Sequence, residues 1–381
     1  MRPLTVSLCL LLLMTAGWTQ TPWRDQAGRW TETSHRWNRA HHTVISGFHN
    51  MYNLHVIHDP GAPYPFQGWF FGWAVKDCNA HLESFTGCDA MFHCRARQIA
   101  GPWEVWTGQG WDVGGSTPGS WRPVIVPDNK PYDSWHNGDP SVVKHRGVYY
   151  MAYSASGHDL DGIPAHLPGD TDGSALCIMG ATSRDGIVWT RTERPILMAS
   201  NELGTTVPEG DSAPDGSYCR PSLMRDGNRW KLWFDYWNAQ TKTVDMGYAE
   251  NRGDFANPAH WKVIRAGNTP ALGAFPNPDV VKVGRMYHAF GDPPGYGEGW
   301  ASRQICEAVS PDGVNWTPAG WLKPDPDTPA QHTPEALVVS SRGRTTLYLF
   351  YACQIGGEPD YNWRYDRILV ISRSLDSKEP Q

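Results

Sequence analysis

The sequence predicts an all-β protein that folds as a single domain, a five-bladed β-propeller. The 381 residues include 39 Gly, 31 Pro and 20 Trp, and Gly and Pro mark turns whereas flat aromatic rings suit sheets. Strand-like runs rich in Tyr, Phe and Trp recur along the chain, and self-similar four-stranded units are typical of propellers. A β-sandwich is the alternative, but it does not predict one strand-turn-strand phrase at successive positions.

Each aromatic run is expected to be the strand next to the innermost strand of one blade. The runs cover residues 69–73, 149–153, 232–236, 286–290 and 347–351. Before the last four stands an x-Pro-x-apolar-apolar segment, predicted to be the innermost strand, at residues 139–143, 220–224, 277–281 and 333–337. Two units continue into a Ser-x-Asp-Gly-x-x-Trp phrase, at 183–189 and 310–316. This phrase predicts a hairpin, so Asp185 and Asp312 are expected to be turn residues rather than site residues.

The N-terminal segment carries the features of an export signal. Arg2 precedes an apolar stretch over 4–14 and small residues at 15–17, which is the order of a secretory signal peptide, assigned to residues 1–17. That stretch is shorter than the roughly 20 apolar residues that span a bilayer. Residues 18–49 are expected to form a polar arm and residues 50–375 the propeller. Its blades are expected near 50–106, 139–196, 219–264, 277–323 and 333–375.

Charge and cysteine content narrow the partners and the compartment. Lys and Arg number 33 against 39 Asp and Glu, for a net charge of −6, so no basic stripe for nucleic acid is expected. A secreted or periplasmic protein without a membrane partner is predicted. Export permits disulfides, and Cys78, Cys88 and Cys94 are close enough in sequence to form one. The absence of a C-x-x-C spacing disfavours a structural zinc site.

Acidic residues at the starts of the innermost strands are the catalytic candidates. Asp139, Asp279 and Glu335 begin separate blades, and His332 comes just before the fifth-blade strand. Strand alternation places Asp279 and Glu335 one pleat deeper than Asp139. Cleavage of a glycosidic bond needs one carboxylic acid and one carboxylate, and a third carboxylate raises the pKa of its neighbour. A purely structural alternative pairs these acids with Arg220.

Residues expected to bind the substrate lie at the same end of the channel. Flat aromatic rings stack on sugar faces, while polar side chains bond hydroxyl groups. A Trp-rich segment at 102–136 and a polar loop at 155–174 supply such groups beside the strand starts. The substrate-binding candidates are Arg220, Asn277, Trp111, Trp135 and His158.

The start of the second unit resembles a known group of enzymes. Residues 138–141 (GDPS) and 147–154 (GVYYMAYS), with the Ser-x-Asp-Gly-x-x-Trp turns, resemble glycoside hydrolase family 43 and its relatives over residues 50–375. Family 43 places its acids on blades one to three, whereas here they begin blades two, four and five. The order Asp, Asp, Glu looks more like family 117, whose members cleave 3,6-anhydro-L-galactose from agar oligosaccharides. That resemblance implies Asp139 as base, Asp279 as a supporting acid and Glu335 as proton donor, with His332 as a rival donor.

The expected function is therefore a secreted glycosidase that removes terminal sugars from plant or algal oligosaccharides or polysaccharides by an inverting mechanism. A non-catalytic carbohydrate-binding propeller, or a lyase working through His and Tyr, is the alternative. Opposed carboxyl groups about 6.5–9.5 Å apart indicate inversion, and about 5–5.5 Å retention. No cofactor and no catalytic metal are expected. A structural Ca²⁺ in the channel is a further possibility, and His55 is the residue that could help to hold a metal there.

Overall fold

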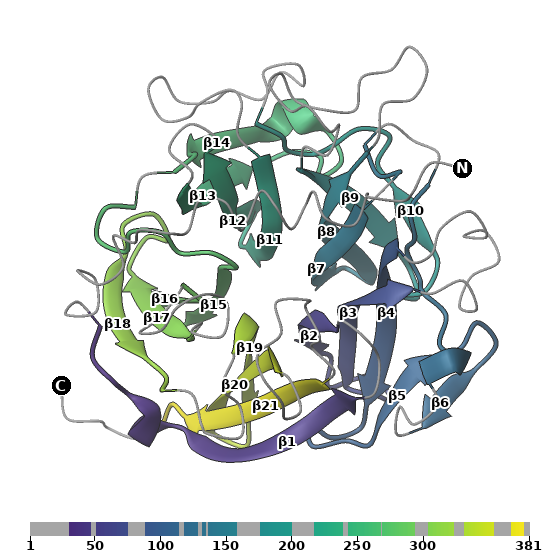
Figure 1. Cartoon of the computed structure of the whole chain (residues 1–381), viewed down its shortest axis with the longest axis horizontal. Coiled ribbons are helices and arrows are strands. Elements are labelled where there is room, and N and C mark those ends of the chain that lie inside the picture. The colour runs from purple at the N-terminus through teal and green to yellow at the C-terminus, as the bar shows by residue number, and fades with distance from the viewer. Residues whose placement is uncertain are drawn as a thin grey trace, which may run out of the picture.

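Five antiparallel sheets form a ring around a central axis in the computed structural model (Figure 1), which confirms the predicted five-bladed propeller. The structure describes residues 30–46, 51–74, 88–113, 118–128, 132–134, 136–157, 176–199, 217–238, 243–267, 269–293, 304–323, 331–353 and 367–376. The innermost strands of the five blades are β2, β7, β11, β15 and β19. Among the described residues, no helix is long and apolar enough to cross a membrane.

The strands follow the chain blade by blade. Blade one contains β2 (Tyr52–His58), β3 (Phe66–Ala74), β4 (Cys88–Ala96), β5 (Trp103–Trp106) and β6 (Trp111–Val113). Blade two contains β7 (His136–His145), β8 (Val148–Ser156), β9 (Cys177–Ser183) and β10 (Trp189–Arg191). Blade three contains β11 (Ser217–Asp226), β12 (Arg229–Asn238), β13 (Thr243–Asn251) and β14 (Trp261–Arg265). Blade four contains β15 (Asp279–Val283), β16 (Met286–Gly291), β17 (Cys306–Ser310) and β18 (Thr317–Trp321).

Blade five joins the two ends of the described chain. It contains β19 (His332–Ser341), β20 (Arg344–Cys353) and β21 (Arg367–Ser374), and its outer strand is β1 (Asn38–Ser46), which pairs antiparallel with β21 (Figure 1). Residues 18–49 were expected to form an arm outside the propeller, whereas residues 38–46 form the strand that closes the ring. An outer strand needs few apolar residues, and on β1 only Val44 and Ile45 are buried among the side chains that the structure describes.

The x-Pro-x motif has a local structural cause. One residue near the start of each innermost strand has a positive φ, between 47° and 54°, at Asn53, Asp139, Arg220, Asn277 and Thr333. The pairing register shifts at this point in four of the blades, which is the signature of a β-bulge. Proline follows in blades two to five, where the bulge leaves no ladder bond for an N–H to make. The bulge residues and the residues two positions further on therefore turn toward the axis in every blade.

The Ser-x-Asp-Gly turns are structural, as expected. Oδ1 of Asp185 accepts hydrogen bonds from the N–H groups of Ile187 and Val188, at 2.9 and 2.8 Å. The carbonyl of Gly186 accepts a bond of 2.9 Å from the indole of Trp69 in blade one. The same bond joins Trp233 of blade three to Gly313 in blade four, at 2.7 Å. Each turn thus anchors its blade to the preceding one.

Hydrogen bonds between neighbouring blades join their innermost strands. In blades two, three and four, the side chain two residues after the bulge accepts a hydrogen bond from a backbone N–H of the next blade. That N–H belongs to the residue three positions after the bulge of its own blade. The pairs are Ser141 with Leu223, Ser222 with Val280 and Asp279 with Ala336, at 2.9, 2.9 and 2.6 Å. These bonds fix the inner strands relative to one another and hold the polar residues near the axis in position.

The cysteine side chains that the structure describes are buried thiols. Cys94, Cys177, Cys219 and Cys306 are free, and Sγ of Cys353 accepts a hydrogen bond of 3.2 Å from Nε of Arg367. The side chains of Cys78 and Cys88, with which a disulfide was predicted, lie outside the described residues, so that pairing stays a prediction.

Candidate active site

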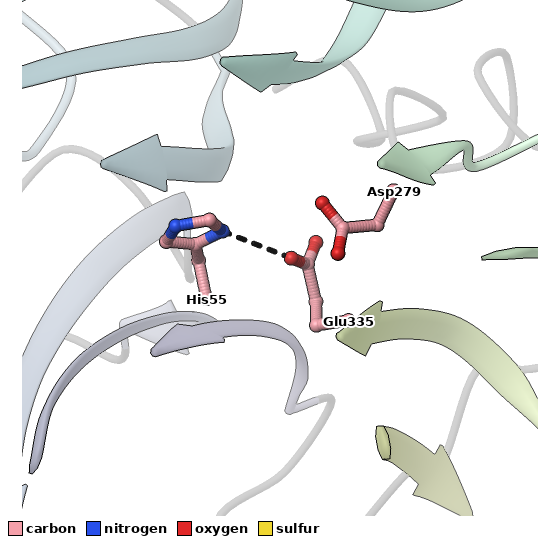
Figure 2. Close-up of side chains that lie close together, drawn as sticks. All are labelled: His55, Asp279 and Glu335. Carbon is pink, nitrogen blue, oxygen red and sulfur yellow. Dashed lines mark hydrogen bonds and ion pairs between the residues drawn. The ribbon is translucent and has the colours of Figure 1, made fainter. Parts of the chain in front are cut away.

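A buried cluster near the axis joins blades one, four and five. Ligand atoms of His55, Asp279 and Glu335 all lie within 4.8 Å of one another. Figure 2 shows the Glu335 carboxyl group between the His55 ring and the Asp279 carboxyl group. These residues occupy the same position in their blades, two residues after the bulge. The structure thus brings together two of the predicted catalytic carboxyl groups and adds a histidine.

Glu335 makes hydrogen bonds with both of its oxygens and is only 5% exposed. Oε1 accepts a bond of 2.9 Å from Nδ2 of Asn53, and Oε2 lies 3.0 Å from Nδ1 of His55. Burial raises the pKa of Glu335 well above its usual range, and the negative charges of Asp279 and Asp139 add to this effect. Burial and these neighbouring charges therefore favour the protonated form of Glu335.

Asp279 is fixed by bonds from the two flanking blades. Oδ1 accepts a bond of 2.8 Å from the hydroxyl group of Ser222, and Oδ2 accepts the Ala336 N–H at 2.6 Å. Burial raises the pKa of Asp279, while the nearby His55 and these two bonds act in the opposite direction. Both oxygens are occupied by protein donors, so Asp279 is held as a fixed neighbour of Glu335.

Asp139 differs from the other two acids in having an open acceptor. It is 3% exposed, and its Oδ1 is buried without a hydrogen-bond partner in the protein. It stands at the bulge position of blade two, one pleat away from the level of Asp279 and Glu335. A buried oxygen without a partner needs water or a ligand to satisfy it.

Arg220 and Asn277 occupy the bulge positions of blades three and four. Nη1 of Arg220 lies 3.2 Å from Oδ2 of Asp235. Nε of Arg220 is buried without a protein partner, and so is Oδ1 of Asn277. Burial alone would lower the pKa of Arg220, but Cys219, Asp139 and Asp235 raise it above its usual value. The guanidinium group is therefore a permanent cation beside the predicted base.

Asp235 and Asp292 were not singled out in the sequence, and both hold bulge residues in place. Asp235 on β12 accepts the Asn277 N–H at 2.7 Å, and burial raises its pKa to about 7, opposed by Arg220. Asp292 follows β16 and accepts the Thr333 N–H at 2.8 Å and a bond from Nδ2 of Asn277. Ser154 does the same in blade two, for the N–H of Arg220. When the blades are aligned on their bulges, Ser154, Asp235 and Asp292 fall at the same position. That alignment is the signal in the sequence that could have identified them.

His332 is fully buried and bonded through Nδ1 to Oδ2 of Asp292. Its ring lies 5.7 Å from the ring of Tyr52. A carboxylate on Nδ1 fixes the tautomer and orientation of a histidine. His332, the rival proton donor of the sequence prediction, therefore has its own acidic partner in Asp292.

Of the other three substrate-binding candidates, the structure describes only Trp111. Trp111 is on β6, the outermost strand of blade one, and the Arg95 guanidinium carbon lies 3.7 Å from the centre of its ring. One face of Trp111 is thus covered by the protein itself. Trp135 and His158 lie outside the described residues.

The cluster of His55, Asp279 and Glu335 by itself offers fewer donors than a calcium site uses, and the structural Ca²⁺ expected in the channel stays a prediction. Calcium takes about six to eight oxygen ligands, whereas the cluster found among the described residues offers two carboxyl groups and one imidazole. Both oxygens of Asp279, both oxygens of Glu335 and both nitrogens of His55 already have protein partners.

No protein-family model and no curated protein matches the chain. Solved structures match its fold. A family 117 glycoside hydrolase from the marine bacterium Zobellia galactanivorans is 12% identical with a TM-score of 0.57, covering 89% of this chain and 91% of that one. A thermostable family-43 glycoside hydrolase is 11% identical with a TM-score of 0.54, covering 89% and 98%.

A third match shows that the fold carries other chemistry. An N-acetylgalactosamine deacetylase from F. plautii, solved with blood group B trisaccharide, is 14% identical with a TM-score of 0.56, covering 89% of this chain and 96% of that one. The chain therefore has the five-bladed fold of the propeller glycoside hydrolases, as the sequence indicated. Because one fold hosts several activities, the site has to carry the functional argument.

Proposed function

We propose that the protein is a secreted glycosidase that hydrolyses terminal glycosidic bonds of oligosaccharides or polysaccharides. The observation that carries this proposal is the contrast between two acids. Glu335 is buried beside Asp279 with a raised pKa, while Asp139 keeps an oxygen without a protein partner. One protonated acid and one acceptor for a water proton are what glycoside hydrolysis needs.

In the proposed reaction the glycosidic C–O bond breaks as Glu335 transfers its proton to the leaving oxygen. Asp139 takes a proton from a water molecule, whose oxygen forms the new bond to the anomeric carbon. Direct attack by water inverts the configuration at that carbon. A proton relay through solvent then returns the proton from Asp139 to Glu335 and completes the cycle.

Asp279 is assigned a supporting role. One of its oxygens lies within 4.8 Å of Glu335, closer than the separation of about 5–9.5 Å between the two acting carboxyl groups of glycosidases. Its oxygens are also held by Ser222 and Ala336. Asp279 therefore acts through its negative charge, which keeps Glu335 protonated.

The bulge residues of blades two to four supply the groups for binding the sugar. Oδ1 of Asn277 can accept a bond from a sugar hydroxyl, and Nε of Arg220 can donate one to a hydroxyl oxygen. Both stand at the same level of the ring as Asp139. Plant and algal oligosaccharides, the substrates indicated by the sequence resemblance, present such hydroxyl groups.

The test is release of reducing sugar from a panel of plant and algal oligosaccharides by the purified full chain. Wild-type protein is expected to release a terminal sugar, and Asp139→Asn to release none. NMR of the first-formed anomer checks inversion. Sugar binding by the wild type without any bond cleavage across the panel would establish the non-catalytic alternative, whereas an unsaturated product would establish a lyase.

A further inference from the structure

His55 offers its two ring nitrogens to two different partners. Nε2 lies 2.9 Å from the carbonyl oxygen of Val142 on β7, and Nδ1 lies 3.0 Å from Oε2 of Glu335 on β19. A carbonyl oxygen can only accept a hydrogen bond, so Nε2 carries a hydrogen. The Val142 carbonyl, held in the ladder of the next blade, therefore selects the tautomer of His55.

The hydrogen between Nδ1 of His55 and Oε2 of Glu335 can belong to either group. Burial lowers the pKa of His55, although the charge of Asp279 opposes this. A neutral ring carries its hydrogen on Nε2 and a lone pair on Nδ1. The carboxylate of Asp279 on the other side of Glu335 disfavours the alternative, an imidazolium beside an ionised Glu335. A lone pair and an ionised carboxylate 3.0 Å apart would repel, so the hydrogen between them belongs to Glu335.

We propose that His55 is a positioning residue for Glu335, which it holds in the protonated form by accepting the carboxyl hydrogen at Nδ1. The inference rests on the proposed role of Glu335 as the proton donor. It assigns His55 a function in proton transfer in place of the metal-binding role that the sequence suggested for it.

The groups around the pair reinforce this arrangement. Asp279 on β15 and Asp139 on β7 place negative charge near Glu335 and so disfavour its ionisation. Asn53, on the same strand as His55, donates to Oε1, while Asp279 is also within hydrogen-bonding reach of the Glu335 carboxyl group and favours its protonated form. The hydroxyl of Ser141 lies 3.5 Å from Nδ1, at the edge of hydrogen-bonding range. Glu335 is therefore the nearest group to Nδ1 that can share a hydrogen with it.

Two substitutions separate the two nitrogens of His55. The oxygen of Asn reaches the position of Nδ1, so His55→Asn keeps an acceptor for Glu335. The amide of Gln reaches the position of Nε2, so His55→Gln keeps the contact with Val142 and loses the acceptor. His93→Gln is the matched control, because His93 is a buried histidine of the same blade that bonds the Gly68 carbonyl instead.

The readout is the pH profile of kcat/KM on a substrate whose leaving group needs a proton. Loss of the acceptor destabilises the protonated carboxyl, so in His55→Gln the alkaline limb is expected to move to lower pH by about one unit. His55→Asn and His93→Gln are expected to keep the wild-type limb. An unchanged limb in folded His55→Gln, or the same displacement in His93→Gln, would overturn the proposal.

A second measurement needs no activity. Side-chain ¹⁵N NMR of the wild type, with the His55 signals assigned by comparison with His55→Gln, is expected to show the neutral tautomer with hydrogen on Nε2 at pH 7. An imidazolium or a hydrogen on Nδ1 would contradict the assignment. If NMR shows the expected tautomer but the protein has no glycosidase activity, the assignment of the proton stands and the proposed function is refuted. Loss of activity on chelation, restored by Zn²⁺ or Mn²⁺, would make Nδ1 a metal ligand and overturn the proposal.

Discussion

Asp292 accepts a hydrogen bond from His332, and both side chains are fully buried. The same carboxylate also receives the Thr333 N–H and the side-chain amide of Asn277. It therefore joins blade four to blade five at the level of the bulges. The pair resembles the orienting carboxylate and histidine of many proton-transfer sites, which makes it necessary to separate a structural role from a catalytic one.

We expect Asp292→Asn to lower the free energy of unfolding by about 2–4 kcal/mol, because a buried acceptor of three bonds is replaced by a group that is partly a donor. Urea unfolding measures this change. Asp59→Asn is the control, since Asp59 forms a partly exposed pair with Lys144 at 2.7 Å and should cost less than about 1 kcal/mol. Equal effects in the two variants would rule out the structural importance of Asp292.

The choice between Glu335 and His332 as donor is decided by leaving-group dependence. Glu335→Gln is expected to lose about 10²- to 10⁴-fold in kcat on the natural oligosaccharide and little on an aryl glycoside, whose leaving group departs without a proton. Asp139→Asn is expected to lose activity on both. Equal losses for Glu335→Gln on the two substrates would remove Glu335 from the donor role, and His332→Gln would then show the selective loss.

Much of this arrangement could be predicted from local sequence, and the failures have identifiable causes. The Asp139-Pro140 pair and its repeats marked the bulges because proline occupies a position without a ladder bond. Blade one has Leu54 after its bulge residue Asn53, so the proline motif did not show that His55 stands at the same position as Asp279 and Glu335, although His55 was expected to face the channel. Aligning the blades on structure rather than on proline corrects this.

The sequence prediction also missed a pairing between strands that are far apart in the chain. Strand β1 pairs with β21, more than 300 residues later in the chain, and a local periodicity carries no information about such a partner. Asp235 and Asp292 were missed because they lie on or just after second strands, where the aromatic runs indicated only core. The polar role of that position becomes visible when Ser154, Asp235 and Asp292 are compared across blades.

Between blades four and five, a buried ion cluster predicts a specific acid sensitivity. Arg373 donates two hydrogen bonds to Glu307, and Nδ1 of His288 lies 2.8 Å from the same carboxylate. Burial acts to raise the pKa of Glu307, but His288 and Arg373 outweigh it and lower the pKa to about 2. Because the folded-state pKa lies below the usual value, this stabilisation is present above about pH 4.5 and is lost as the pH falls toward 2.

Arg373→Met is therefore expected to destabilise the protein by about 3–5 kcal/mol at pH 7, because it leaves a buried carboxylate with only His288. The loss should shrink at low pH, where Glu307 becomes protonated in the variant. Unfolding free energies measured between pH 3 and 7 check this. A pH-independent difference between variant and wild type would show that Arg373 acts through packing on Trp37, 4.8 Å from its ring, rather than through charge.

The tightest test of how the blades pack uses two glycines with the same backbone angle. Gly186 and Gly147 both have a φ of +77°, so alanine at either position incurs a similar backbone cost of about 1–2 kcal/mol. A Cβ on Gly186 would lie 2.8 Å from the ring of Trp69, whereas a Cβ on Gly147 would have nothing within 4 Å. Trp69 is fully buried and bonded to the Gly186 carbonyl, so it cannot move aside cheaply. Gly186→Ala should therefore exceed Gly147→Ala in destabilisation by about 1–3 kcal/mol in thermal or urea unfolding. Indistinguishable values for the two variants would mean that the interface between blades one and two yields to the methyl group, and that the Ser-x-Asp-Gly turn does not fix the spacing of those blades.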